Sequence, residues 1–186
     1  MKVKWPILIV GLGGTAALIA LLATGFSANI NTAVTDVITG KQAPAFELVD
    51  LQGRTWSVEE LEGKPVFINF WSTWCGPCKM EHPMLLQAAK AYPDVQFLGI
   101  IYNDAAAAVD VQLRRPPYNR LMSELESAAI EYPNLSDPDG RTALRYGVVG
   151  VPESFFVDRT GLVTYKQVGP LNADTAKREL ARIRKQ

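Results

Sequence analysis

The sequence is poor in the residues that build disulfide frameworks and metal clusters. Its 186 residues include two cysteines, Cys75 and Cys78, and one histidine, His82. This count excludes a scaffold of several disulfides and a zinc site of four Cys and His ligands, and any disulfide must join these two cysteines or link to a partner. Nineteen basic residues balance nineteen acidic ones. The chain therefore has no positive field for nucleic acid, and we expect no such partner.

Apolar residues make up 48% of the chain and charged residues 20%. This composition is normal for a globular protein and too apolar for a disordered one. The length allows one domain of ordinary size with a short appendage and leaves no room for two full domains. We therefore expect a single hydrophobic core.

The longest apolar segment runs from Pro6 to Phe26, contains no charge and follows Lys2 and Lys4. A helix of this length crosses a bilayer core, and lysines before it place the amino terminus in the cytoplasm. A cleaved signal peptide is the alternative, because small residues around Ala23 lie where a peptidase could cut, although cleavable apolar regions are usually shorter. We expect a cytoplasmic amino terminus at 1–5, a single-pass transmembrane anchor in the cell membrane at 6–26, a polar tether at 27–42 and a folded extracytoplasmic domain at 43–186, in the periplasm or at the outer face.

Within the folded domain, turn residues and apolar periodicity predict a mixed α/β sheet with helices on both faces. The run from Pro65 to Trp71 is almost wholly apolar, as in a central strand, and Val95 to Tyr102 is a second buried strand. Between them, apolar residues at 80, 84, 85, 88, 89 and 92 have helical spacing. We also predict a hairpin of 46–51 and 54–57, a helical turn at 58–62, a helical Ala-rich stretch before residue 133, a turn at 136–140, a short helix at 143–146, strands at 154–158 and 163–168, and a closing helix at 174–185.

The chemistry concentrates at Cys75 and Cys78, where the buried strand turns into a helix. The first helical turn offers unpaired N–H groups and the positive end of the dipole, and both stabilise an anion. We therefore expect Cys75 to be the more acidic, attacking thiol and Cys78 to be the shielded thiol that resolves a mixed disulfide. A zinc knuckle would lack two ligands, and a copper site of the Cys-x-x-x-Cys kind has another spacing. Two inert buried thiols are the open alternative.

The segment FWSTWCGPC at 70–78, together with Val151 and Pro152, resembles the thioredoxin superfamily. In that superfamily a cis proline faces the two sulfurs, and the backbone before it pairs with a bound peptide; Pro152 and Val151 match. Residues 43–83 and GVVGVPESFFVDRTG at 147–161 are similar to the membrane-tethered DsbE/CcmG, ResA and TlpA group of cytochrome c maturation. The resemblance implies a thioredoxin-like mixed sheet flanked by helices, with an amino-terminal β-hairpin and one transmembrane helix. It also implies a redox-active disulfide between the two cysteines, with no other cofactor and no metal.

Three polar residues near the cysteines or the proline match the pattern of that group. Asn69 stands where minimal thioredoxins have a buried Asp, and the group commonly has Asn there. Glu81 matches the acidic residue that the group places near the sulfurs, and Glu153 matches the one after the cis proline. A carboxylate beside a thiol destabilises the thiolate and can accept its proton. Solvated residues of a helix or loop are the alternative for both, and we expect His82 on the helix surface.

The resemblance implies thiol-disulfide exchange on protein thiols and disulfides. The residues implied are Cys75, Cys78 and Glu81 for catalysis, and Trp74, Val151, Pro152 and Glu153 for substrate binding. Gly76 and Pro77 are those of reducing thioredoxins, which favours a reductant of apocytochrome c or of its thiol carrier, recharged by a membrane thiol carrier of the DsbD/CcdA kind.

Three alternatives stay open at this point. A general thiol-disulfide reductase would share the same site. A peroxidase is suggested by FELVDLQG, which is similar to peroxiredoxins, although their Pro-x-x-x-Thr-x-x-Cys pattern meets Ile68 and Ser72 here. A binding module without turnover is the third. Residues 105–120 fit the group poorly, and we expect an extra loop or helix over the sheet.

Overall fold

The computed structural model describes residues 13–15, 17–20, 38–105 and 132–185. Residues 13–15 and 17–20 are helical and belong to a unit Met1–Val34, separate from the unit Thr35–Gln186. Within the described ranges, no helix has the length and apolar character needed to span a membrane. Most of the predicted anchor at 6–26, residues 27–37 of the tether and most of the segment 105–120 lie outside these ranges.

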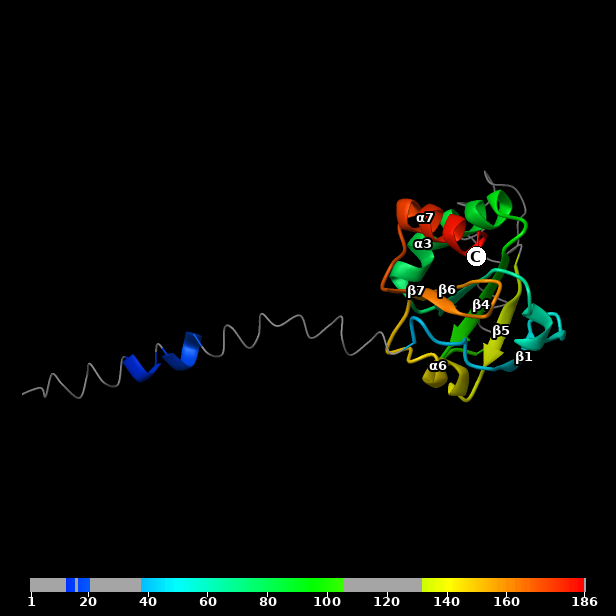
Figure 1. Cartoon of the computed structure of the whole chain (residues 1–186). Helices are drawn as coiled ribbons and strands as arrows, with labels where there is room; N and C mark the ends of the chain where they lie inside the picture. The colour runs from blue at the N-terminus through cyan, green and yellow to red at the C-terminus, as the bar shows by residue number, and fades with distance from the viewer. Residues whose placement is uncertain (1–12, 16, 21–37, 106–131, 186) are drawn as a thin grey trace, which may run out of the picture. The chain divides into compact units, whose positions relative to one another are not determined.

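The larger unit is built on a sheet whose seven described strands follow the order β2-β1-β5-β4-β3-β6-β7 (Figure 1). The strands are β1 Glu47–Asp50, β2 Thr55–Ser57, β3 Val66–Trp71, β4 Gln96–Tyr102, β5 Asn134–Asp137, β6 Glu153–Val157 and β7 Val163–Val168. The helices are the 3-10 turn η1 Glu59–Leu61, and α3 Gly76–Ala91, α6 Arg141–Arg145 and α7 Ala173–Ile183. Strand β4 is parallel to β3 and β5, and the remaining neighbours are antiparallel.

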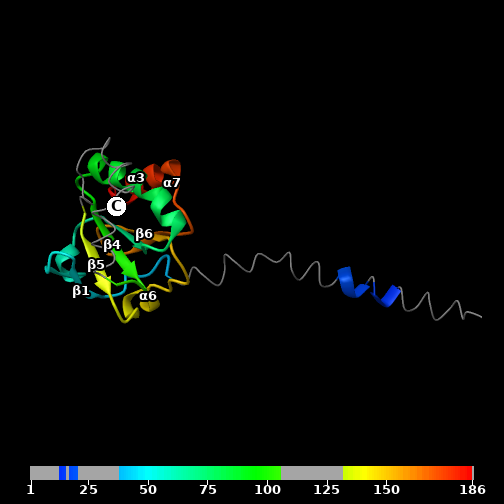
Figure 2. The same cartoon turned by 180° about the vertical axis from the view of Figure 1, so that it is seen from behind.

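Strand β3 is buried along its whole length because both faces of the sheet are covered. On one face Phe67 packs into a cluster with Leu85 of α3 and Leu180 of α7. On the other face Ile68 belongs to a cluster with Tyr146, which follows α6. Figures 1 and 2 show α3 and α7 together on one side of the sheet and α6 on the other. The predicted mixed α/β sheet with helices on both faces is confirmed.

The predicted amino-terminal hairpin is also confirmed, and one carboxylate fixes its turn. Asp50 Oδ1 accepts hydrogen bonds from the backbone N–H groups of Gln52 and Arg54, each at 2.9 Å, and Oδ2 accepts from Trp56 Nε1 at 2.8 Å. Gly53 has a φ of 85°, which favours glycine at this tight position. Because β1 also pairs with β5, the hairpin extends the main sheet.

Strand β5 is not predicted from the sequence pattern, and the turn expected at 136–140 is wrong in its first residues. The strand has a single large apolar residue, Leu135, so it shows no apolar run or alternation. Its polar side chains are instead used inside the fold. Asn134 Oδ1 accepts from Trp71 Nε1 at 2.7 Å, and the Asp137 carboxylate accepts from the N–H groups of Thr142 and Ala143 at the start of α6.

The buried face of α3 differs from the predicted apolar stripe. Met80 is 75% exposed, whereas His82 is 1% exposed. The His82 ring lies 5.5 Å from the ring of Trp71 and 6.0 Å from that of Tyr132, measured between centroids. The expected surface position of His82 is therefore wrong, because these two aromatic side chains cover this turn of the helix. Burial lowers the pKa of His82 to about 4.

Candidate active site

The two cysteines form a disulfide at the point where β3 passes into α3. Cys75 is the N-cap of α3, and its Sγ accepts a hydrogen bond from the Cys78 backbone N–H at 3.1 Å. Pro77 lies in the first turn, where the missing N–H of proline costs no helical hydrogen bond. Both sulfur-bearing residues are buried in this oxidised state. The local structure is that expected from a Cys-x-x-Cys at a helix amino terminus.

Segments from three parts of the chain meet at this disulfide. Cys75 and Cys78 form a small cluster with the buried Trp71 and Ile101, and Val151 packs against it. The Val151–Pro152 peptide bond is cis, as the resemblance implies. The structure therefore brings the proline loop before β6 to the sulfurs.

Trp71 is held in place by a hydrogen bond that is not predicted from the sequence. Its Nε1 donates to Asn134 Oδ1 above Gly99 of β4. A Cβ atom at residue 99 would collide with Asn134 Oδ1 and would lie 2.9 Å from Trp71 Nε1. A glycine inside a buried strand is the one sequence signal of this close approach.

Glu81 is 5% exposed and belongs to a buried polar network. Its Oε1 accepts from Asn69 Nδ2 at 2.9 Å and its Oε2 accepts from the Leu171 N–H at 2.7 Å. Asn69 Nδ2 also donates to Ser154 Oγ at 3.0 Å. Burial raises the pKa of Glu81 to about 7, although both hydrogen bonds favour the carboxylate. A solvated helix residue is therefore excluded, and near neutral pH this group can either hold a proton or release it.

Glu153 is fully buried, so in this structure its carboxylate does not reach a surface where substrate could contact it. Its Oε2 lies 2.8 Å from Lys166 Nζ, whose side chain is also buried, and its Oε1 accepts from the Val149 N–H at 3.0 Å. Lys166 Nζ donates in addition to the Gly147 carbonyl at 2.8 Å. The expected substrate contact is replaced by an ion pair that holds the 147–149 loop before Val151.

Two large apolar side chains are exposed in the segments directly before Cys75 and before the cis proline. Trp74, directly before Cys75, is 58% exposed, and Val149, in the loop before the cis proline, is 67% exposed. The Trp74 Nε1 donates to the Asn103 carbonyl at 3.2 Å, which keeps the indole beside the loop after β4. Exposed apolar groups of this kind are typical of surfaces that bind other polypeptides.

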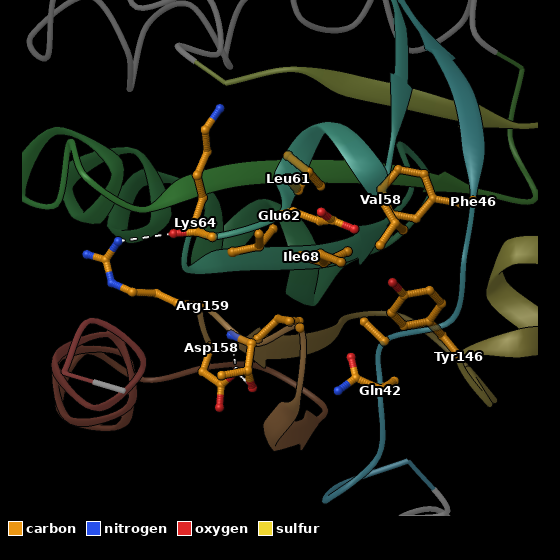
Figure 3. A pocket seen from close by; sticks show the side chains of 16 residues that line it. Gln42, Phe46, Val58, Leu61, Glu62, Lys64, Ile68, Tyr146, Asp158 and Arg159 are labelled. Carbon is orange, nitrogen blue, oxygen red and sulfur yellow. Dashed lines mark hydrogen bonds between the residues drawn. The ribbon is translucent and has the colours of Figure 1, made fainter.

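A cavity of about 350 Å³ lies at the opposite end of β3. Figure 3 shows Phe46 and Val58 of the hairpin region on one side of it and Tyr146 on another, with Ile68 of β3 between them. The Arg159 Nη1 donates to the Gly63 carbonyl at 3.2 Å beside the cavity (Figure 3). None of the predicted site residues lines this space, so it is not part of the disulfide site.

Exchange of disulfides is the chemistry that a capped, buried cysteine pair beside a cis proline can perform, because the first sulfur is stabilised as an anion and the second is one turn away. In the ranges that the structure covers, no group of three or more His, Cys, Asp or Glu residues could hold a metal ion. The chain is a thioredoxin-like thiol-disulfide oxidoreductase. Comparison with known proteins then gives its family: residues 39–166 match the AhpC/TSA family, and the chain belongs to it.

Two proteins of similar sequence are thiol-disulfide oxidoreductases as well. The thiol:disulfide interchange protein DsbE of Pseudomonas aeruginosa is 34% identical over 151 residues, which cover 80% of this chain and 77% of that protein. The thiol-disulfide oxidoreductase ResA of Geobacillus thermodenitrificans is 32% identical over 169 residues, covering 90% and 91%. The predicted likeness to the DsbE and ResA proteins is confirmed.

Two solved structures share the fold at similar identity. A thiol:disulfide interchange protein of the thioredoxin family from Chlorobium tepidum has a TM-score of 0.62 and 29% identity, with 76% of this chain and 94% of that chain covered. A secreted Mycobacterium tuberculosis disulfide oxidoreductase homologous to Escherichia coli DsbE has a TM-score of 0.60 and 27% identity, with 74% and 95% covered.

Proposed function

We propose that this oxidoreductase reduces disulfides of protein substrates on the extracytoplasmic side of the membrane during cytochrome c maturation. The substrate is apocytochrome c or the thiol protein that presents it. The observation that carries the chemistry is the hydrogen bond from the Cys78 N–H to Cys75 Sγ at the start of α3. The direction is supported by Gly76 and Pro77, and the pathway by the resemblance to the DsbE and ResA group.

The proposed reaction begins with the reduced protein. The Cys78 N–H and the first turn of α3 stabilise a thiolate on Cys75, which attacks one sulfur of the substrate disulfide and forms a mixed disulfide. The other substrate sulfur leaves and takes up a proton. The Cys78 thiolate then attacks Cys75 Sγ, the second substrate thiol leaves, and the Cys75–Cys78 disulfide forms. Two electrons pass to the substrate, and a membrane thiol carrier of the DsbD/CcdA kind restores the dithiol.

Glu81 has a proposed part in the second step. It lies one helical turn after Cys78 on α3, and its pKa of about 7 lets it accept a proton from the Cys78 thiol when that thiol must attack. Trp74, Val151 and Pro152 are proposed to contact the substrate strand. Glu153 is proposed to act through the loop that it holds.

The peroxidase alternative has less support from the site. The position of the peroxiredoxin proline is Ile68, a core residue, and that of the threonine is Ser72, whose hydroxyl donates to the Tyr102 carbonyl. Neither side chain is free to bind a peroxide beside Cys75. The named relatives, DsbE and ResA, are disulfide interchange proteins.

Trapping of the mixed disulfide tests the proposal. The full chain, reduced, is mixed with oxidised insulin or with a peptide containing a Cys-x-x-Cys-His disulfide, and adducts are identified by mass spectrometry. Cys75→Ser should lose reduction, whereas Cys78→Ser should stall as an adduct on Cys75. An adduct on Cys78 in the Cys75→Ser variant would reverse the assignment. Faster reaction with the haem-site peptide supports a maturation role, and equal rates support a general reductase.

A further inference from the structure

The loop after β4 bonds to the segment directly before Cys75. The hydroxyl of Ser72 donates to the Tyr102 carbonyl. Asp104 Oδ2 accepts from both the backbone N–H and the hydroxyl of Thr73, at 2.7 and 2.6 Å. The indole of Trp74 completes the set through its bond to the loop backbone. Residues 72, 73 and 74 are thus each bonded to one of residues 102–104, and we call these contacts the 72–74 clamp.

The clamp stands where regular sheet pairing ends. Strands β3 and β4 pair in parallel as far as Trp71 opposite Ile101. The next three residues after β3 lead to the N-cap of α3 and lie beyond this pairing, and hydrogen bonds that involve side chains connect them to the loop after β4. Asn103 has a φ of 46°, a left-handed conformation that asparagine tolerates better than most residues. The carbonyl of this left-handed residue, Asn103, is the one that accepts the hydrogen bond from the Trp74 indole.

Asp104 supplies the charged acceptor of the clamp. A carboxylate that accepts two hydrogen bonds forms shorter and stronger bonds than a neutral acceptor. Its second oxygen, Oδ1, accepts from the Ala105 N–H at 2.8 Å, so the side chain is held at both oxygens. Removal of this side chain would release Thr73, which comes just before the exposed Trp74 and the N-cap residue Cys75.

We propose that Asp104 is a positioning residue for disulfide exchange, which through Thr73 fixes the direction in which Cys75 meets a substrate disulfide. This inference rests on the proposed function, because a thiolate must approach along the line of the bond that it breaks. Reactions of this kind lose about a hundredfold in rate when the reacting atom is misplaced by about 1 Å. Asp104 itself does not touch the reacting sulfurs through any of the contacts described.

Two substitutions at Asp104 separate its hydrogen bonds from its charge. In Asp104→Asn the amide oxygen can replace Oδ2 and still accept both bonds from Thr73, and only the bond from the Ala105 N–H is lost, whereas Asp104→Ala removes all three. We expect Asp104→Ala to slow formation of the mixed disulfide with insulin by about ten- to a hundredfold. The rate of Asp104→Asn should stay within about threefold of the wild-type rate, because Thr73 keeps an acceptor for both of its hydrogen bonds and Cys75 therefore keeps its position. Equal loss in both variants would overturn the proposal in favour of a charge effect.

The chain offers a matched control at the turn after β6. Asp158 Oδ1 accepts from the N–H and hydroxyl of Thr160 at 2.8 and 2.6 Å, the same pair of contacts away from the disulfide. Asp158→Ala should lower stability to urea as Asp104→Ala does, yet keep the exchange rate. A wild-type rate in Asp104→Ala, or an equal rate loss in Asp158→Ala, would show a merely structural role. If Asp104→Ala does not fold, Thr73→Val, which keeps the N–H and loses the hydroxyl, should give a smaller loss of the same kind, and an unchanged rate overturns the proposal.

Alkylation of Cys75 by iodoacetamide in the reduced full chain gives a readout that needs no protein substrate. Asp104→Ala should alter its rate at fixed pH and Asp158→Ala should not. A wild type that is alkylated normally but reduces neither insulin nor the haem-site peptide would refute the proposed function and leave the clamp to be judged on this readout. Wild-type alkylation and exchange rates in Asp104→Ala would refute the clamp alone.

Discussion

Neutralisation of Glu81 should change how the stability of the oxidised protein depends on pH. Burial raises the pKa of this carboxyl from 4.5 to about 7. A carboxyl with a higher pKa in the folded than in the unfolded state binds more protons when folded, so its contribution to the free energy of unfolding falls as the pH rises through this range. In Glu81→Gln the side chain does not titrate, and this contribution is absent.

The size of the effect follows from the shift. A difference between 4.5 and about 7 corresponds to roughly 3 kcal/mol of unfolding free energy at about 1.4 kcal/mol per pKa unit. The new amide can be accommodated: its oxygen accepts from the Leu171 N–H, and its nitrogen donates to Asn69 once that amide has turned. The Ser154 hydroxyl can then rotate to donate to Asn69. Any residual misfit adds a constant and leaves the pH-dependent part unchanged.

The assay is urea unfolding of both proteins with the disulfide intact, between pH 4 and 8.5. The unfolding free energy of Glu81→Gln minus that of the wild type should be level below about pH 4.5, rise by roughly 3 kcal/mol and become level again above about pH 8. Glu179→Gln is the control, because it removes a buried carboxylate that is paired with Arg178 at 2.8 Å and should lower stability. A difference that stays within about 0.5 kcal/mol over the whole range would refute the reasoning.

Further outcomes are expected from the same structure. In the reduced protein, Glu81→Gln should shift the alkylation of the thiols to lower pH and change exchange rates several-fold, and superimposable pH curves would show that the carboxylate does not act on the sulfurs. Lys166→Met leaves Glu153 buried without its partner and should cost roughly 3–5 kcal/mol in urea unfolding; the double variant with Glu153→Gln should recover part of it, and no recovery would contradict the ion pair. If 6–26 is a retained anchor, alkaline washing of membranes should leave the intact chain in the pellet and external protease should remove the domain. A soluble form beginning near residue 28 would indicate a signal peptide instead.

The parts of the fold that the sequence predicts well are those with local signals. The apolar run of β3, the glycine turn of the hairpin and the Cys-x-x-Cys at the start of α3 each depend on neighbouring residues alone. The resemblance adds the cis proline and the carboxyl of Glu81, whose burial the composition of α3 does not indicate.

The parts that the sequence does not predict depend on partners far along the chain. Strand β5 exists because β1 and β4 flank it and not because of its own composition. His82 is buried because Trp71 and Tyr132 cover it. Glu153 is turned inward by Lys166, which lies on the neighbouring strand β7. In each case tertiary contacts override what the local pattern favours.

Burial shifts the pKa values of the adjacent residues Glu81 and His82 in opposite directions, and these shifts decide where protons are bound before and after folding. Their pKa values move from 4.5 to about 7 and from 6.5 to about 4. Between pH 4.5 and pH 6.5, the ordinary pKa values of the two groups, the unfolded chain carries an anion next to a cation, whereas the folded chain carries two neutral groups. Folding there amounts to the passage of one proton along the chain from His82 to its neighbour, with no net uptake from solvent by this pair. In mildly acidic solution, the heat of unfolding should therefore contain no term from this pair that varies with the ionisation enthalpy of the buffer.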